Sequence, residues 1–148
     1  MINVDNTPLR AAAVGCMLAL VLLAAGVTNA DAGRPRVTNR CPINAQPLRA
    51  SDLPALRRFG LALAPHGVQR AGSQTIDYRD ARAKASFPTF YTRYVRSVCP
   101  AAVAKRVIAR TADVSVDYPH VTWSASLSSS VFLVARTPRG FVGWAQMH

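Results

Sequence analysis

The sequence predicts an α+β fold: an antiparallel meander of three or four strands in the C-terminal half, with one or two helices packed on one face, preceded by a cleaved N-terminal signal helix. Two stretches, 51–63 and 86–98, carry apolar residues at helical spacing. From 113 to 128 apolar and polar residues alternate, as in strands that bury one face. We therefore divide the chain into a signal peptide over 1–32, an extended arm over 33–50 and a single α+β domain over 51–148.

The N-terminal segment is typical of an export signal. An uncharged run follows Arg10 and ends at Ala30, and its apolar part is 17 residues long. That length lies between a signal core of about 7–15 residues and a membrane span of about 20. Small side chains at Ala30 and Ala32 suit a signal peptidase, so we expect cleavage after Ala32. The alternative is a single-pass membrane anchor, and the arginines within 34–40 would then favour a cytoplasmic location for the rest of the chain.

Residues 33–50 are rich in proline and arginine and show no hydrophobic periodicity, so we expect an extended arm. Cys16 leaves with the signal, and Cys41 and Cys99 remain. In an oxidising compartment this pair is expected to form one disulfide. Two buried free thiols are the alternative, favoured if the anchor is retained. With no Cys-x-x-Cys pair and few histidines, we expect neither a metal site nor a cofactor.

The first helix is predicted to start at Ser51 or Asp52, which can cap free amide groups, and to stop at Pro65. Residues 68–85 are ambiguous: 74–78 could form a short strand, while 79–85 has a helix-forming composition.

A second helix is predicted from Ser86 to Cys99. Its apolar stripe consists of Phe87, Phe90, Tyr91, Tyr94, Val95 and Val98. In that register the tyrosines pack in the core, while Arg93 and Arg96 face solvent. Because Phe, Tyr, Thr and Val also favour strands, a strand stays open as the alternative. Aromatic and arginine side chains together could also stack on bases or sugars, but core packing is the favoured interpretation for Tyr91 and Tyr94.

The C-terminal part predicts the sheet. The buried faces of the first two strands are expected to be Val114, Val116 and Tyr118, then Val121, Trp123, Ala125 and Leu127. The continuous apolar run 131–135 favours a more central strand. Pro138 and Gly140 suit a tight turn, so 141–147 should pair back as a hairpin.

Charge is the strongest compositional feature. After Ala32 the chain holds 15 Arg and 2 Lys against 5 Asp and no Glu, a net charge of +12. Such a field attracts phosphate polymers, anionic glycans and acidic membrane surfaces. The candidate anion-binding residues are Arg93, Arg96, Lys105, Arg106 and Arg110. A solvated basic surface without a dedicated partner is the alternative.

Catalytic groups are scarce. Asp117 and His120 lie on either side of a predicted turn and could form a base and its orienting carboxylate. An ordinary turn, in which Asp117 accepts backbone hydrogen bonds, is favoured because no third triad member can be identified. A metal site of Asp113, Asp117 and His120 has the same weakness. We therefore expect no catalytic site.

The stretch 123–128, the apolar strand after it and Gly143-Trp144 resemble a group of small uncharacterised secreted proteins of actinobacteria. Residues 95–99 share in this resemblance, although Cys99-Pro100 stands where such proteins often carry Cys-Gly. The resemblance implies export and a bacterial source, and it transfers no site residue.

These features predict an exported, small, basic, disulfide-linked domain that is a non-catalytic binding or structural component of the cell envelope or extracellular medium. Its expected partners are anionic envelope polymers or a membrane surface, with no specific nucleic acid. A secreted hydrolase acting on an envelope polymer is one alternative, which an open cleft joining His120, Asp117 and a serine would favour. A secreted inhibitor or toxin is another, which a protruding rigid loop would favour.

Overall fold

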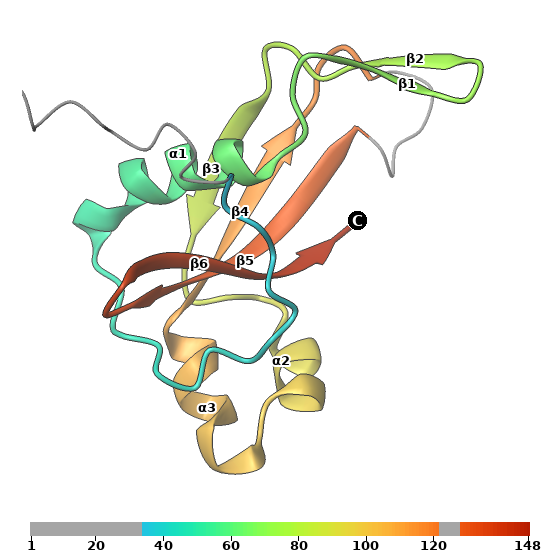
Figure 1. Cartoon of the computed structure of the whole chain (residues 1–148). Coiled ribbons are helices and arrows are strands. Elements are labelled where there is room, and N and C mark those ends of the chain that lie inside the picture. The colour runs from blue at the N-terminus through green and yellow to red at the C-terminus, as the bar shows by residue number, and fades with distance from the viewer. Residues whose placement is uncertain (1–33, 122–127) are drawn as a thin grey trace, which may run out of the picture. The chain divides into compact units, whose positions relative to one another are not determined.

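The computed structural model describes residues 34–121 and 128–148 (Figure 1). The predicted cleavage site after Ala32 and most of the predicted strand over 121–128 lie outside these ranges. In chain order the elements are η1 (Ala50–Asp52), α1 (Leu53–Leu63), β1 (Val68–Ala71), β2 (Gln74–Asp77), β3 (Arg82–Ser86), α2 (Thr92–Val98), α3 (Ala101–Ala109), β4 (Thr111–Asp117), β5 (Ser129–Thr137) and β6 (Gly140–Met147).

The described residues form a four-stranded antiparallel sheet in the order β3–β4–β5–β6 and a separate two-stranded hairpin, β1–β2. The predicted α+β class and the C-terminal meander are therefore confirmed. The run 131–135 lies in β5, an interior strand, as its continuous apolar character indicates. The turn before β6 closes the predicted hairpin at Gly140, whose φ of 113° suits glycine.

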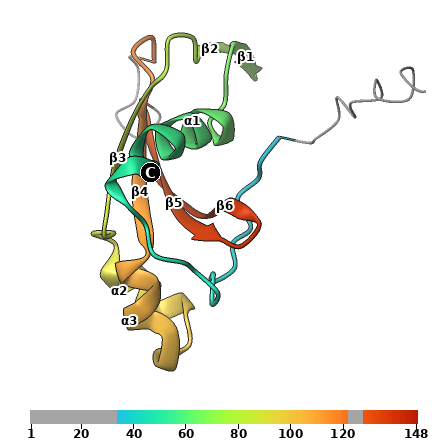
Figure 2. The same ribbon diagram turned by 90° about the vertical axis from the view of Figure 1, so that its left-hand side faces the viewer.

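Helix α1 covers one face of this sheet and contacts all four of its strands (Figure 2). The helix starts with Pro54 in its first turn and ends just before Pro65, as the sequence predicts. Asp52 precedes the helix, but its side chain makes no capping bond to α1 and instead accepts from the backbone N–H of Arg49. Leu56 is fully buried against Val114 and Phe132 in the core on this side. Gly60 lies so close to Val114 that a Cβ atom would overlap that side chain. The absent side chain is therefore what lets α1 approach β4.

Helices α2 and α3 pack against a second core, at the lower end of the sheet in Figure 1. Val95 and Val107 are fully buried here together with Leu133 and Trp144, which come from β5 and β6. Tyr94 stacks on Trp144 with ring centroids 6.0 Å apart. Alternate residues of β5 thus serve two cores, one on each face of the sheet.

The second helix begins later than the sequence predicts. Ser86 does not cap it but ends β3, where it pairs with Asp113 of β4. The helix starts at Thr92. Two residues predicted to be in the apolar stripe are exposed, Phe90 at 81% and Val98 at 44%. Residues 82–85, with their helix-forming composition, are extended because β3 pairs along its whole length with β4. Sheet pairing overrides local preference here.

Asp113 is a further correction. Its place in the alternation predicts a solvent-facing side chain, but Asp113 is buried. The loop between β3 and α2 covers it, because Thr89 and the backbone of Phe90 both donate hydrogen bonds to its carboxylate. This loop lies more than twenty residues earlier in the sequence. The alternation of polar and apolar residues in the strand therefore could not indicate that Asp113 is buried.

The predicted disulfide is present. It joins Cys41 of the arm to Cys99, between α2 and α3, with Cα atoms 5.3 Å apart. Such bonds are typical of proteins that fold outside the cytoplasm. Across residues 34–121 and 128–148, every helix is too short or too polar to cross a lipid bilayer.

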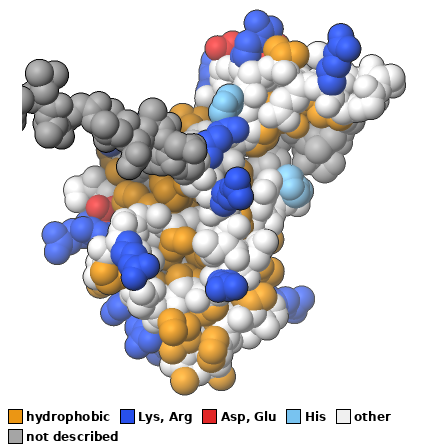
Figure 3. All heavy atoms as spheres, in the orientation of Figure 1, with side chains coloured by type: hydrophobic (Ala, Val, Ile, Leu, Met, Phe, Trp, Pro, Cys, Tyr) orange, Lys and Arg blue, Asp and Glu red, His pale blue; other side chains and the backbone are white. Residues whose placement is uncertain are grey.

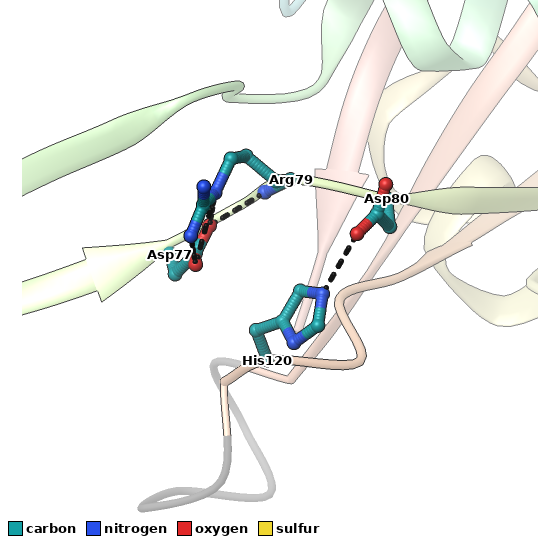
Figure 4. Close-up of polar contacts among 4 residues, drawn as sticks. All are labelled: Asp77, Arg79, Asp80 and His120. Atoms are coloured by element: carbon teal, nitrogen blue, oxygen red, sulfur yellow. Dashed lines mark hydrogen bonds and ion pairs between the residues drawn. The ribbon is translucent and has the colours of Figure 1, made fainter.

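The β1–β2 hairpin extends from the upper end of the domain, and two polar side-chain contacts lie at its base (Figures 1 and 4). Arg79 donates from Nη2 to Asp77 Oδ2 at 2.6 Å, and this contact lowers the pKa of the Asp77 carboxyl. His120 Nε2 lies 2.9 Å from Asp80 Oδ2. Tyr78 packs edge-on against Tyr118, with ring centroids 5.1 Å apart. The hairpin therefore joins the body through its base.

Candidate anion-binding site

The arm, residues 34–49, crosses the domain without forming a regular element of its own beyond one bridge, Gln46 to Arg136. Its backbone is held by two hydrogen bonds, one of which belongs to that bridge. Thr38 N–H donates to Gly143 O at 2.9 Å, and Gln46 N–H donates to Arg136 O at 2.8 Å. Together with the disulfide, these bonds fix an extended segment that carries several arginines.

Two of the predicted anion-binding residues also hold the arm. Arg106 Nη2 donates to Ile43 O at 3.1 Å, and Arg110 Nη1 donates to Ala45 O at 2.8 Å. These two arginines therefore hold the arm through its backbone carbonyls, as Arg34 holds the start of the arm through Ala64 O. The other three predicted residues, Arg93, Arg96 and Lys105, are exposed on α2 and α3. The structure gives no contact that gathers these three into one site.

Two hollows lie along the arm, and each contains two arginines. The first, of about 420 Å³, is lined by Arg34, Pro35, Arg36 and Val37 of the arm and by Ala62, Leu63 and Gln146. The second, of about 600 Å³, is lined by Thr38, Arg40, Cys41, Pro42 and Asn44 of the arm and by Thr137, Arg139, Phe141 and Val142. We call these two hollows together the arm grooves.

The arm grooves suit anions in both charge and geometry. A guanidinium is permanently charged and can donate two parallel hydrogen bonds to a carboxylate or phosphate. Arg36, Arg40 and Arg139 are exposed, and Thr38 and Asn44 add polar groups at the rim. Arg34 makes one bond, from Nη2 to Ala64 O at 3.3 Å, which anchors the start of the arm beside the end of α1. The grooves therefore offer cationic donors on a fixed backbone.

Acidic groups do little to neutralise this charge. Within residues 34–121 and 128–148, the arginines paired with a carboxylate are Arg79 and Arg136. Figure 3 shows Lys and Arg side chains spread over the visible face, with acidic side chains at only a few places. A surface of this kind keeps a positive potential over a wide area and attracts polyanions.

Sequence reasoning missed the arginines of the arm grooves. Arg34, Arg36 and Arg40 were visible as a cluster after the signal, but there they argue only about membrane topology. Arg139 lies in a turn nearly a hundred residues further along the chain, and only the packing of the arm beside β6 brings it near Arg40. The usable signal was the combination of an aperiodic arm and three closely spaced arginines.

The structure gives no support to the catalytic pair considered above. His120 pairs with Asp80, while Asp117 lies in β4 opposite Arg82 and Ser129. Pro119 and His120 form the predicted turn. In the part of the chain that the structure describes, no group of three His, Cys, Asp or Glu side chains could hold a metal ion.

Asp113 is a buried titratable group that lines a hollow of the surface. Burial raises its pKa, and the hydrogen bonds from Thr89 and Phe90 partly oppose that effect. Each carboxylate oxygen already accepts one of these bonds. Asp113 therefore serves to position the loop before α2.

Comparison of the chain with family models, with curated proteins and with solved structures finds no match. The candidate site accordingly rests on its own geometry and charge.

Proposed function

We propose that this chain is an exported, non-catalytic domain that binds an anionic polymer of the cell envelope or extracellular medium along its arm. The observation that carries the proposal is the pair of arm grooves, each lined by two arginines, on a domain with a net charge of +12. Export agrees with the signal-like N-terminal segment and with the Cys41–Cys99 disulfide.

The arrangement of the grooves favours a polymer over a small anion. They lie on successive parts of one extended segment, and the bond from Thr38 to Gly143 lies between them. An extended chain advances by up to about 3.3 Å per residue, so Arg34 and Arg40 lie within about 20 Å of each other. A polyanion can place several charged units over that span, whereas a single phosphate or carboxylate can occupy only one groove.

The test measures binding of polyphosphate of defined length to the mature domain over a series of salt concentrations. Association with a polyanion releases counterions, so affinity should fall steeply as salt rises. The triple variant Arg36→Gln, Arg40→Gln, Arg139→Gln removes three exposed groove charges and should weaken binding and flatten its salt dependence.

A matched control separates a site from simple net charge. The triple variant Arg57→Gln, Arg58→Gln, Arg70→Gln removes the same charge from exposed positions on α1 and β1. A third variant, Arg93→Gln, Arg96→Gln, Lys105→Gln, removes the exposed cations predicted from sequence. The proposal requires the groove variant to lose clearly more affinity than both others. Equal losses in all three would contradict it and leave only a diffuse basic surface.

A secreted inhibitor is the second candidate, because the β1–β2 hairpin extends from the body and carries Val68, which is 55% exposed (Figure 1). An inhibitor of this kind would present the hairpin to a protein partner. Replacing Gln69 to Ala71 by glycine and serine should then abolish association with that partner and leave polyphosphate binding unchanged.

A further inference from the structure

Phe90 is the most exposed large hydrophobic side chain among the described residues, at 81%. It belongs to the basic-aromatic stretch 90–96, in which Tyr91 and Tyr94 are half-buried and Val95 is in the core. The exposed Phe90 is thus the aromatic residue of this stretch that core packing does not explain.

The backbone around Phe90 is fixed by hydrogen bonds to the buried residues Thr89 and Asp113. Thr89 is buried and donates from Oγ1 to Asp113 Oδ1, while Phe90 N–H donates to Asp113 Oδ2 at 2.8 Å. Tyr91 N–H then donates to Thr89 Oγ1 at 3.1 Å. A buried network thus holds the loop in place, and the exposure of Phe90 follows from that fixed backbone.

Phe90 stands at the edge of a hollow of about 460 Å³. The hollow is lined by Lys84, Ala85, Ser86, Phe90, Tyr91, Asp113, Ser115 and Val131. Lys84 pairs with Ser115 and Ser86 with Asp113 across β3 and β4, so the polar members share one sheet face. We call this hollow the Phe90 pocket: it has an aromatic wall and polar side chains that include one cation, Lys84, and one carboxylate, Asp113, whose two oxygens already accept bonds from Thr89 and Phe90.

That combination matches a sugar ring. A pyranose presents C–H groups that pack on an aromatic face and hydroxyl groups that need hydrogen-bonding partners, and a uronic acid adds one carboxylate. The pocket volume lies within the range of ligand sites, about 300–1,000 Å³. Ser86 and Ser115 can bond hydroxyl groups, and Lys84 can pair with the carboxylate.

We propose that the Phe90 pocket binds one pyranose unit of an anionic glycan, with the ring stacked on Phe90 and its carboxylate beside Lys84. The choice of an acidic sugar rests on the proposed function, since it narrows the polymer to a glycan. The pocket itself is separate from the arm grooves, with which it shares no lining residue.

The experiment is an NMR titration of the full mature domain with trigalacturonate at high salt, which screens the arginines of the arm. Phe90→Ala should reduce the affinity about tenfold, a loss typical of one stacking contact. Lys84→Gln should also reduce it when the titration is repeated at low salt, where the charge of Lys84 is not screened, and the amide signals of Phe90 and Ser115 should move on titration. Val68→Ala, which removes another exposed apolar side chain, should bind as the unaltered domain does.

Polyphosphate has no sugar ring, so its binding tests the arm grooves and not the Phe90 pocket. Phe90→Ala should therefore bind polyphosphate as tightly as the unaltered domain does. If trigalacturonate binds equally to the unaltered domain and to Phe90→Ala and Lys84→Gln, the pocket proposal is overturned while the arm proposal stands. A thymidine oligonucleotide is a second comparison. If Phe90→Ala reduces the affinity for this oligonucleotide more than the affinity for trigalacturonate, the pocket favours a base and the proposal is also overturned. Both variants alter exposed side chains and leave the bonds to Asp113 in place, so they are expected to fold.

Discussion

Asp113 is a buried carboxylate whose two oxygens each accept a hydrogen bond from the loop that precedes α2. These bonds hold the backbone at Thr89 and Phe90, in the loop between the end of β3 and the start of α2. Desolvation favours the neutral form of the carboxyl, and its pKa is raised above the ordinary value of 3.8. The network that positions the loop therefore makes stability depend on pH.

The sign of that dependence follows from proton linkage. Between the ordinary pKa and the raised one, the folded state binds more protons at Asp113 than the unfolded state does. The contribution of Asp113 to stability is thus full below about pH 3.8 and is lost as the pH rises through the raised pKa. The test is denaturant unfolding of the unaltered domain and of Asp113→Asn from pH 3 to pH 7. As the pH rises, the unaltered domain should lose stability relative to Asp113→Asn. A constant difference would show that Asp113 does not titrate in this window.

Gly60 is a second position where one residue sets the packing of an element. Alanine here would improve helix propensity by up to about 1 kcal/mol, but its Cβ would overlap the Val114 side chain. Overpacking of a core costs about 1–3 kcal/mol, so Gly60→Ala should reduce the free energy of unfolding by about 1 kcal/mol.

A double-mutant cycle with Val114→Ala checks this cause. Shortening Val114 makes room for the new methyl group, so Gly60→Ala should cost less in the Val114→Ala background than in the unaltered domain. Additive effects of the two substitutions would rule out the steric explanation.

Among the elements, those with a clean hydrophobic period could be predicted. The stripe of α1, the continuous apolar run of β5 and the turn before β6 carry local signals, and the structure bears each of them out. The segment 86–91 could not be predicted in the same way, because its aromatic residues fit a helix and an extended chain equally well. Its conformation is decided by pairing with β4 and by Asp113, which are remote in sequence.

The same limit applies to the candidate site. The cationic character of the domain was evident from composition, but the arm grooves depend on where an aperiodic arm lies across β6. Nothing in the sequence places Arg139 beside Arg40. Likewise, no local pattern shows that Arg106 and Arg110 donate to arm carbonyls. Composition predicts the kind of ligand, and tertiary contacts select the residues.

The arm is the element whose attachment is easiest to test. The Cys41–Cys99 disulfide closes a loop of 58 residues, which on the chain-entropy model contributes about 4 kcal/mol. The double variant Cys41→Ser, Cys99→Ser should lose about that much stability in denaturant unfolding. The unaltered domain measured under reducing conditions should behave like the variant. Equal stability of the oxidised and reduced domains would contradict a stabilising role.

At the scale of the whole molecule, export, oxidation and charge form one linked prediction. Cleavage after Ala32 would remove Cys16 and leave Cys41 and Cys99 as an even pair. It would also create an α-amino group at Gly33, directly before Arg34 of the first arm groove. Such a group has a pKa of about 8 and is largely charged at neutral pH, so processing would add one more cation at the start of the arm.

Intact mass spectrometry of the exported chain, with and without reduction, tests these links together. The expected mass is that of residues 33–148, and a thiol-alkylating reagent should add at two positions only after reduction. Cleavage is thus judged from the mass of the native protein, and the disulfide from its response to reduction. The full-length mass would contradict cleavage and favour the membrane anchor, whose arginine-rich flank would then face the cytoplasm. Alkylation of two thiols without prior reduction would show that Cys41 and Cys99 are not bonded to each other. The arm would then lack the covalent link that holds it in place to bind a polymer.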